Sequence, residues 1–214
     1  MIHAVAWSGG KDSMLALDRA VRQGIDVRYL LNIVHGLTGR VRFHGVRAEL
    51  IARQAEALRL ELVQPFTSPE GFEAAFLGGL GDLLSRGVEG IIFGNIHLAD
   101  VRAWYEERTT AHGLVHVEPI WGEPPGGLVA EVLARGYRTR VVSVDLGRGD
   151  RGWLGRELDP GLAGTIAAHP GADPAGEQGE FHTFVFDGPL FRHPVMHEVG
   201  AVHEEEGHAQ IDLT

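Results

Sequence analysis

The chain of 214 residues is long enough for one large domain or for one domain with a smaller annex, and its formal net charge of -10, without any lysine or arginine run, argues against a nucleic-acid partner. The absence of cysteine excludes disulfides, thiolate metal sites and cysteine nucleophiles. Because no leader-like segment opens the chain and no stretch approaches about 18 uninterrupted apolar residues, we expect a cytoplasmic protein without a membrane partner.

Short apolar runs alternate with helical patterns through the first part of the chain. The expected strands are residues 2–7, 26–34, 61–66, 87–95 and 114–121. The expected helices are residues 13–24, 46–60, 69–86 and 99–113. Ser68 is the expected N-cap of the third helix, and Pro69 its first residue. This alternation predicts an α/β fold with a doubly wound, five-stranded parallel sheet that binds ligands at the carboxyl ends of its strands.

The pattern changes at residues 121–127 (WGEPPGG), a proline- and glycine-rich stretch suited to a domain edge. Beyond it, the sequence predicts a helix near 127–135, a strand near 138–145 and a glycine-rich passage. Strand-like runs follow, with a turn at 187–189 and another near Gly207. We therefore expect a first domain at residues 1–121 and a smaller α+β domain at residues 122–214.

Six residues between the first expected strand and the first expected helix read SGGKDS. Their spacing fits neither the Walker phosphate loop nor the dinucleotide-binding glycine pattern. A strand-to-helix junction is nevertheless an anion site, because backbone N–H groups and the helix dipole point at it. We expect Gly9 and Gly10 to let the backbone approach a phosphate, and Ser8 and Ser13 to donate their hydroxyls. The alternative is a tight turn with a capping acid.

The remaining two residues of this motif carry charge. Lys11 is the only lysine among 19 basic residues, and a compact ammonium is not interchangeable with a guanidinium at a tight anion site. We expect Lys11 to act on the phosphates from an exposed loop. Asp12 is the expected ligand of a magnesium ion.

The motif resembles the SGGxDS loop of the PP-loop ATP pyrophosphatases, which holds the triphosphate of ATP so that attack falls on the α-phosphorus. Further blocks resemble the diphthine–ammonia ligase family and its adenine-nucleotide alpha-hydrolase-like relatives. In order along the chain, they are RFHG (42–45), EGIIFGNIHLADVRAWYEER (89–108), PIW (119–121), GWLGREL (152–158) and GEQGEFHTFVFDGPLF (176–191). The resemblance implies a Rossmann-like ATP domain followed by a smaller domain, with the active cleft between them. The chain departs from the ligases in DVRAWYEER, where they usually carry a Tyr-Gln-Arg version, and in His182, where many have glutamate.

Polar residues end the fourth expected strand and begin the helix after it. Gly94 is an expected ATP contact, and Asn95, Asp100 and Arg102 are expected to contact the nucleotide or the acceptor substrate, because ligands lie at strand ends in such sheets. The alternative is a polar strand-to-helix corner in which Asp100 is an N-terminal acid.

The resemblance also places Phe43 and His44 near ATP, although core packing of Phe43 is an equal alternative. Glu177 and Glu180, in GEQGE, are expected to lie close together as catalytic or substrate-binding carboxylates. A solvated turn is the alternative reading of this spacing, and the family block favours the site. His182 is expected at the same substrate site.

These residues together predict an enzyme that uses ATP and Mg²⁺ to adenylate an acceptor and release pyrophosphate. The family resemblance implies that the acceptor is a carboxylate, such as one on a protein side chain, and that ammonia displaces AMP to form an amide. A nucleotide-binding sensor with little turnover is the alternative from another class. RNA thiolation, common among PP-loop proteins, fits the acidic and cysteine-free composition less well. A homodimer is compatible with the sequence.

Overall fold

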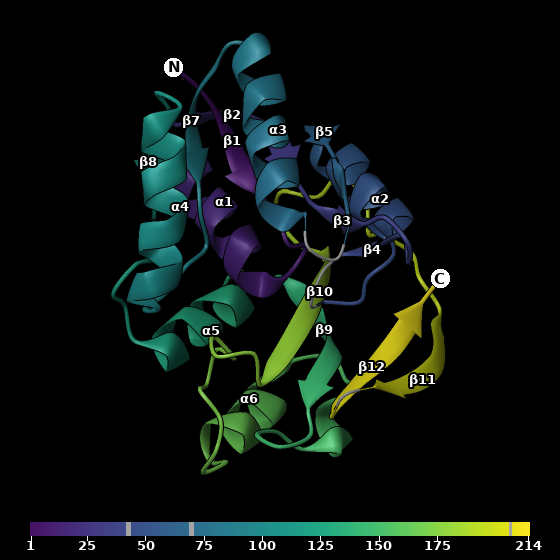
Figure 1. The fold of residues 1–214 in the computed structure, drawn as a ribbon. Coiled ribbons are helices and arrows are strands. Elements are labelled where there is room, and N and C mark those ends of the chain that lie inside the picture. Colours follow the sequence, from purple (N-terminus) through teal and green to yellow (C-terminus); the bar gives the residue numbers. More distant parts are fainter. Residues whose placement is uncertain (42–43, 69–70, 206) are drawn as a thin grey trace.

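The computed structural model describes residues 1–41, 44–68, 71–205 and 207–214. At its centre lies a five-stranded, all-parallel sheet with the strand order β5-β2-β1-β7-β8 (Figure 1). Its strands are β1 (Ile2–Ala6), β2 (Asp26–Leu31), β5 (Glu61–Val63), β7 (Val88–Ile92) and β8 (Val115–Val117). The five-stranded parallel sheet predicted from the alternating pattern is confirmed.

Four helices cover the two faces of this sheet. They are α1 (Lys11–Arg22), α2 (Ala48–Leu58), α3 (Phe72–Ser85) and α4 (Ala99–Ala111). Successive strand residues point to opposite faces, and β1 shows the result: Val5 packs in the cluster that holds α1 and α2, whereas Ala4 packs in the cluster that holds α3 and α4. The sheet is therefore doubly wound.

Several predicted element boundaries are wrong. The predicted strands 61–66 and 114–121 end at Val63 and Val117. The third helix begins at Phe72 with Gly71 as its N-cap, so Ser68 does not cap it; the Ser68 carbonyl instead accepts the Gly71 N–H. Pro69 lies outside the described residues. The predicted strand 26–34 is interrupted after Leu31 and resumes as β3 (Val34–His35).

The interruption reflects a small second sheet with the order β4-β3-β6. It contains β3, β4 (Arg40–Val41) and β6 (Phe66–Thr67). The chain after β2 still runs beside the chain after β5, because the Val34 N–H donates to the Pro65 carbonyl. Proline has no N–H to return to such a ladder, so regular pairing pauses there.

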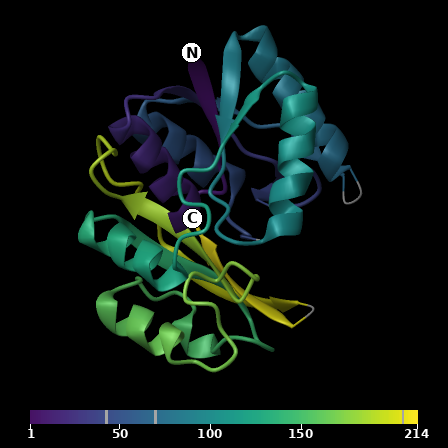
Figure 2. The same cartoon turned by 90° about the vertical axis from the view of Figure 1, so that its left-hand side faces the viewer.

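The second half of the chain forms a four-stranded antiparallel sheet with the order β10-β9-β12-β11, below the parallel sheet in Figure 2. Its strands are β9 (Arg138–Asp145), β10 (Phe181–Asp187), β11 (Val199–Glu205) and β12 (His208–Leu213). Its helical elements are α5 (Pro125–Ala134), the 3-10 turn η1 (Arg151–Trp153) and α6 (Pro160–Ala167). This arrangement confirms the predicted α+β character.

The two halves share a hydrophobic core. One continuous cluster includes Val5 and Leu50 from the first half together with Val142 and Phe184 from the antiparallel sheet. Strand β10 also reaches the first half through its backbone, since the Val185 N–H donates to the Gly9 carbonyl at 2.9 Å. The predicted division between residues 121 and 122 stays a prediction. In the described part of the chain, no helix has both the length and the apolar character needed to cross a membrane.

Candidate active site

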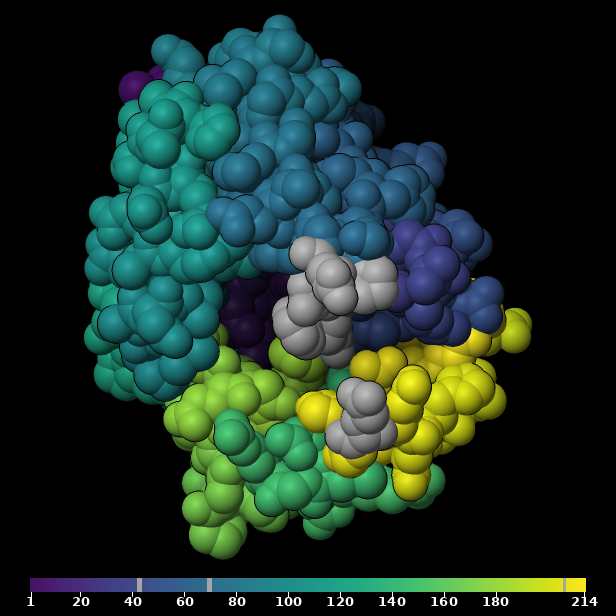
Figure 3. Space-filling view, viewed as in Figure 1, coloured from purple at the N-terminus to yellow at the C-terminus, as the bar shows by residue number. Residues whose placement is uncertain are grey.

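A cavity of about 270 Å³ opens where β1, β2 and β7 end, and segment 176–183 of the second half closes its other side. Figure 3 shows the hollow between α4 and α3, with N-terminal residues at its floor and the second half below. Towards this floor the lining is polar, and towards α3 and α4 it is apolar. The apolar wall includes Leu31, Ile33, Phe72, Phe76, Phe93 and Tyr105.

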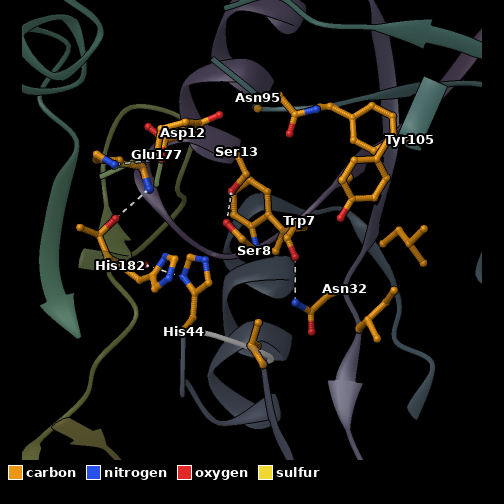
Figure 4. Close-up of a pocket in the computed structure, with 18 of the residues that line it drawn as sticks. Trp7, Ser8, Asp12, Ser13, Asn32, His44, Asn95, Tyr105, Glu177 and His182 are labelled. Carbon is orange, nitrogen blue, oxygen red and sulfur yellow. Dashed lines mark hydrogen bonds and ion pairs between the residues drawn. The ribbon is translucent and has the colours of Figure 1, made fainter. Parts of the chain in front are cut away.

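The SGGKDS segment forms the polar floor: residues 8–10 lie between β1 and α1, and residues 11–13 are the first turn of α1. The hydroxyl oxygens of Ser8 and Ser13 lie 3.1 Å apart (Figure 4). The Gly10 N–H donates to the Ser8 hydroxyl at 3.2 Å, and the Ser13 hydroxyl donates to the Gly10 carbonyl at 3.0 Å. Gly10 is the N-cap of α1 and has no side chain with which to cap it. The segment is thus a compact loop that aims a helix N-terminus at the cavity, as an anion site requires.

Two glycines allow close packing at this floor. A Cβ on Gly94, at the end of β7, would lie 2.8 Å from the backbone of Asp12 and Ser13. Gly9 has a φ of +82°, and a Cβ there would lie 2.6 Å from the Ile51 side chain. Glycine at these positions therefore allows close packing within the protein, in addition to the predicted approach of a phosphate.

A buried glutamine that the sequence analysis missed holds the loop from behind. The indole N–H of Trp7 donates to the Gln54 side-chain oxygen at 2.8 Å. The Gln54 amide donates to the Gly9 carbonyl at 3.0 Å and to the Val185 carbonyl at 2.6 Å. Gln54 therefore joins β1, the loop and β10. A polar residue on a helix face carries no signal of such a role in one sequence.

Lys11 is buried, with 2% of its side chain exposed, so the expectation of an exposed lysine is wrong. Its ammonium lies 2.9 Å from the Asp12 carboxylate and donates to the Ala175 carbonyl. It also lies 4.9 Å from the centre of the Phe181 ring. The loop folds under segment 175–181 of the second half, which explains the burial. Lys11 lines the cavity and connects the two halves.

Asp12 and Glu177 form an acidic wall beside Lys11 (Figure 4). Desolvation raises the pKa of Asp12, and the neighbouring Lys11 ammonium opposes this rise. Desolvation also raises the pKa of Glu177, whose carboxylate accepts the Ile96 N–H at 2.8 Å. Because burial disfavours the charged form of both carboxylates, a cationic group that binds beside them would be stabilised by their ionisation.

Glu180 does not join this wall. It is 1% exposed, and its carboxylate accepts the N–H groups of Asp173 at 2.9 Å and of Gln178 at 3.1 Å. The structure thus separates the two glutamates that the sequence analysis paired: Glu177 faces the cavity, and Glu180 fixes the loop that carries it. The two residues between them reverse the chain, so their side chains leave it in different directions.

Two histidines from different halves complete the polar side. The ring centres of His44 and His182 lie 4.4 Å apart, and both line the cavity. Desolvation lowers the pKa of His44 to about 4 and that of His182 well below its usual value. His44 therefore lines the cavity, and its predicted proximity to ATP stays a prediction. Phe43 lies outside the described residues.

Comparisons with known proteins bear on the whole chain. The family model described as the diphthamide synthase N-terminal domain matches residues 1–115, and the model described as the diphthamide synthase C-terminal domain matches residues 124–212. The chain belongs to the diphthamide synthase family. No curated protein matches it. A solved structure described as a predicted subunit of tRNA methyltransferase from Methanocaldococcus jannaschii aligns with a TM-score of 0.49 and 15% identity, covering 86% of this chain and 96% of that chain.

In this diphthamide synthase family member, the predicted residues after β7 divide between cavity and surface. Asn95 lines the cavity, and its amide donates to the Glu118 carboxylate at 2.8 Å. Arg102 lies outside the lining, with its guanidinium 3.1 Å from Glu118 and stacked 4.7 Å from the Trp121 ring centre. Asp100 is exposed in the first turn of α4, as the alternative of a polar corner expects.

Asn32 is a cavity residue that the sequence analysis missed. It follows β2, is 1% exposed, and donates from its amide to the Trp7 carbonyl at 2.8 Å. The rule applied to Asn95, a polar residue at the end of a buried strand, did not find it, because the predicted strand 26–34 placed Asn32 in its interior. No sequence pattern indicated the apolar wall, because its aromatic rings come from separate elements: α3, α4 and the end of β7.

Proposed function

We propose that this protein is an ATP-dependent amide ligase that adenylates an acceptor carboxylate, releases pyrophosphate and forms an amide with ammonia, as expected for a diphthine–ammonia ligase. The single observation that carries the proposal is the position of the SGGKDS loop, at the N-terminus of α1 and on the floor of a cavity that Glu177 also lines. This geometry suits an anionic nucleotide next to a second substrate.

The cavity offers different environments for the two ends of ATP. Its polar floor suits the triphosphate, because the helix N-terminus and Lys11 favour negative charge there. Its apolar wall, with Ile33, Phe72 and Phe76, suits the adenine ring. Asn32, between the two ends, supplies a polar group to orient the base or ribose.

Asp12 is the candidate magnesium ligand. Among the described residues, no group of three or more acidic or histidine side chains is arranged to hold a metal ion. Magnesium usually keeps several waters and needs only one or two carboxylates together with substrate phosphates, so a single carboxylate beside the loop fits. When bound, the ion would neutralise charge on the phosphates.

The remaining residues suit the second half of the reaction. A carboxylate oxygen of the acceptor attacks the α-phosphorus, the bond to the β-phosphate oxygen breaks, and pyrophosphate leaves. Ammonia then attacks the acyl carbon, AMP leaves, and the nitrogen loses a proton. Glu177 lies beside Asp12 at the cavity and is placed to hold the incoming nitrogen or to accept that proton.

The test is the fate of ATP labelled at the α-phosphate, with candidate acceptor proteins and ammonium ions added. We expect labelled AMP and unlabelled pyrophosphate, in amounts that depend on the acceptor, and an amide in the acceptor only when ammonium is present. ADP as the main product would contradict the proposal. ATP binding without turnover on any acceptor would instead favour a nucleotide sensor.

A further inference from the structure

The pair formed by His44 and His182 has no assigned part in the reaction above. Its two rings come from separate halves of the chain, His44 from the segment after β4 and His182 from β10, and they meet with an interplanar angle of 33° (Figure 4). Both rings line the cavity. Two imidazoles held this closely can share a charge of +1 but resist a charge of +2.

The pair lies directly against the loop proposed to hold phosphate. A Cβ on Gly10 would lie 3.1 Å from His44 Cε1, so this ring packs on the N-cap of α1. His44 Nδ1 lies 3.3 Å from the Thr183 carbonyl oxygen, and a carbonyl can only accept, so the proton is assigned to Nδ1. Nε2 of His44 is then the nitrogen that can take up a proton.

The surroundings keep the pair neutral while the cavity holds no anion. Desolvation is the main cause of the low pKa of each ring, and Lys11 of α1 acts on both in the same direction. His208 of β12 also acts on His182 in this direction. The Asp12 carboxylate, which would oppose these groups, is engaged by the Lys11 ammonium.

We infer that His44 and His182 form one proton-binding site that becomes charged when a polyphosphate occupies the SGGKDS loop, and that the charged pair binds the triphosphate and then the pyrophosphate product. The proton comes from solvent when the anion binds and returns to solvent when pyrophosphate leaves. This inference rests on the ATP-binding part of the proposed function, but not on the acceptor or on turnover.

The inference assigns His182 to the phosphate end of the cavity instead of the acceptor end. It also links affinity to pH, because the bound state holds more protons than the free state. The pair should therefore strengthen polyphosphate binding as the pH falls from 8 to 6. A phosphate within about 4–6 Å raises an imidazole pKa by about 1 to 3, which predicts uptake of about half a proton at pH 6.

The experiment is isothermal titration calorimetry at pH 6 and pH 8, in two buffers of different ionisation enthalpy, with magnesium present. The first ligand is an ATP analogue with a methylene group between the α- and β-phosphorus atoms, which prevents turnover. The second is inorganic triphosphate. Because a terminal phosphate itself titrates near pH 6, the measured quantity is the difference in proton uptake between wild type and the H44Q/H182Q double variant.

The control is His203→Gln, which removes an exposed histidine of β11 that is not among the described residues lining the cavity. We expect H203Q to match wild type, and the double variant to lose the uptake and to bind both ligands about 2-fold more weakly at pH 6, the factor that uptake of half a proton implies. Histidine ring signals in NMR spectra of the wild type give a second measurement that does not depend on the variants' folding. The signals of two rings should shift together on addition of inorganic triphosphate, as expected for one proton shared between them.

Equal proton uptake in wild type and the double variant, or unchanged histidine signals, would overturn the inference while leaving ATP binding intact. Failure of wild type to bind either ligand would overturn both the inference and the proposed function. Binding with the expected uptake, but no turnover on any acceptor, would support the inference and count against the ligase reaction alone.

Discussion

Two segments that meet beside the cavity, residues 8–13 and residues 173–180, are fixed in different ways. The first is a turn between a strand and a helix, closed by bonds among its own serines and Gly10. The second contains no helix or strand and is held by side chains, chiefly the Glu180 carboxylate on the N–H groups of Asp173 and Gln178. A loop whose position follows from the strand before it and the helix after it can be recognised in a sequence. For a loop held by buried side chains, the sequence does not indicate which residues face a ligand.

Separate substitution of the two glutamates of the second segment should give the largest effects. Glu177→Gln keeps an oxygen for the Ile96 N–H but removes the charge, so we expect acceptor-dependent pyrophosphate release to fall by about 10²-fold with little change in stability. Glu180→Gln should instead lower the free energy of unfolding by about 1–3 kcal/mol, because an amide cannot accept two N–H groups as a carboxylate does. Urea unfolding and a pyrophosphate assay distinguish the two effects; reversed results would show that Glu180 acts at the substrate.

A second substitution tests the close packing that defines the first segment. Gly94→Ala would place a methyl group 2.8 Å from the Asp12 backbone, so we expect a loss of about 1–3 kcal/mol in stability together with weaker ATP binding. Gly78→Ala is the matched control, since a Cβ there meets nothing within 4 Å and alanine favours the α3 helix. Equal behaviour of the two variants in thermal unfolding would contradict the close approach.

A third substitution concerns the contact between the segments. Lys11→Arg introduces a larger, planar group where 2% of the side chain is exposed, so we expect a loss of about 1–2 kcal/mol as well as reduced ATP affinity. The control Arg53→Lys exchanges the same two residue types at an exposed position of α2. Near-normal stability and ATP affinity in Lys11→Arg would mean that the ammonium contacts are dispensable.

The smallest expected effect concerns another segment fixed by side chains. Asp212 of β12 accepts hydrogen bonds from Arg47 and Arg40, which lower its pKa to about 2 and hold the segment that carries His44. A lowered carboxyl pKa stabilises the fold above the unfolded value and loses that contribution as the pH falls through the folded value. Asp212→Asn should therefore cost about 1 kcal/mol at pH 7, after screening of the partly exposed arginines, and progressively less between pH 4 and pH 2. A pH-independent difference in urea unfolding would exclude this linkage.

Much of the fold follows from local signals. The strand-to-helix alternation predicts the parallel sheet, and Gly24, which follows α1, has a left-handed φ of +80° that glycine adopts readily. Asp159 and Pro160 carry the cap and first-residue signature of α6, with the Asp159 side chain accepting the Leu162 N–H, although the sequence analysis did not use it. At Ser68, the same type of signature did not begin a helix.

The cavity is less predictable, because its walls come from distant parts of the chain. Four residues of the SGGKDS loop line it, Ser8, Lys11, Asp12 and Ser13, together with His44, Asn95 and Glu177. The burial of Lys11, however, depends on segment 175–181, and no local pattern of residues 8–13 contains that information. Arg102 similarly reaches Glu118 and Trp121 instead of the cavity, through contacts between α4 and the chain after β8.

The most direct test of the central claim is a crystal structure with magnesium and the ATP analogue that carries a methylene group between its α- and β-phosphorus atoms. We predict its phosphates at residues 8–13, beside the pair of His44 and His182, and its adenine against the wall formed by Ile33, Phe72 and Phe76. A nucleotide bound with its phosphates away from residues 8–13, or with its base on that loop, would contradict the account.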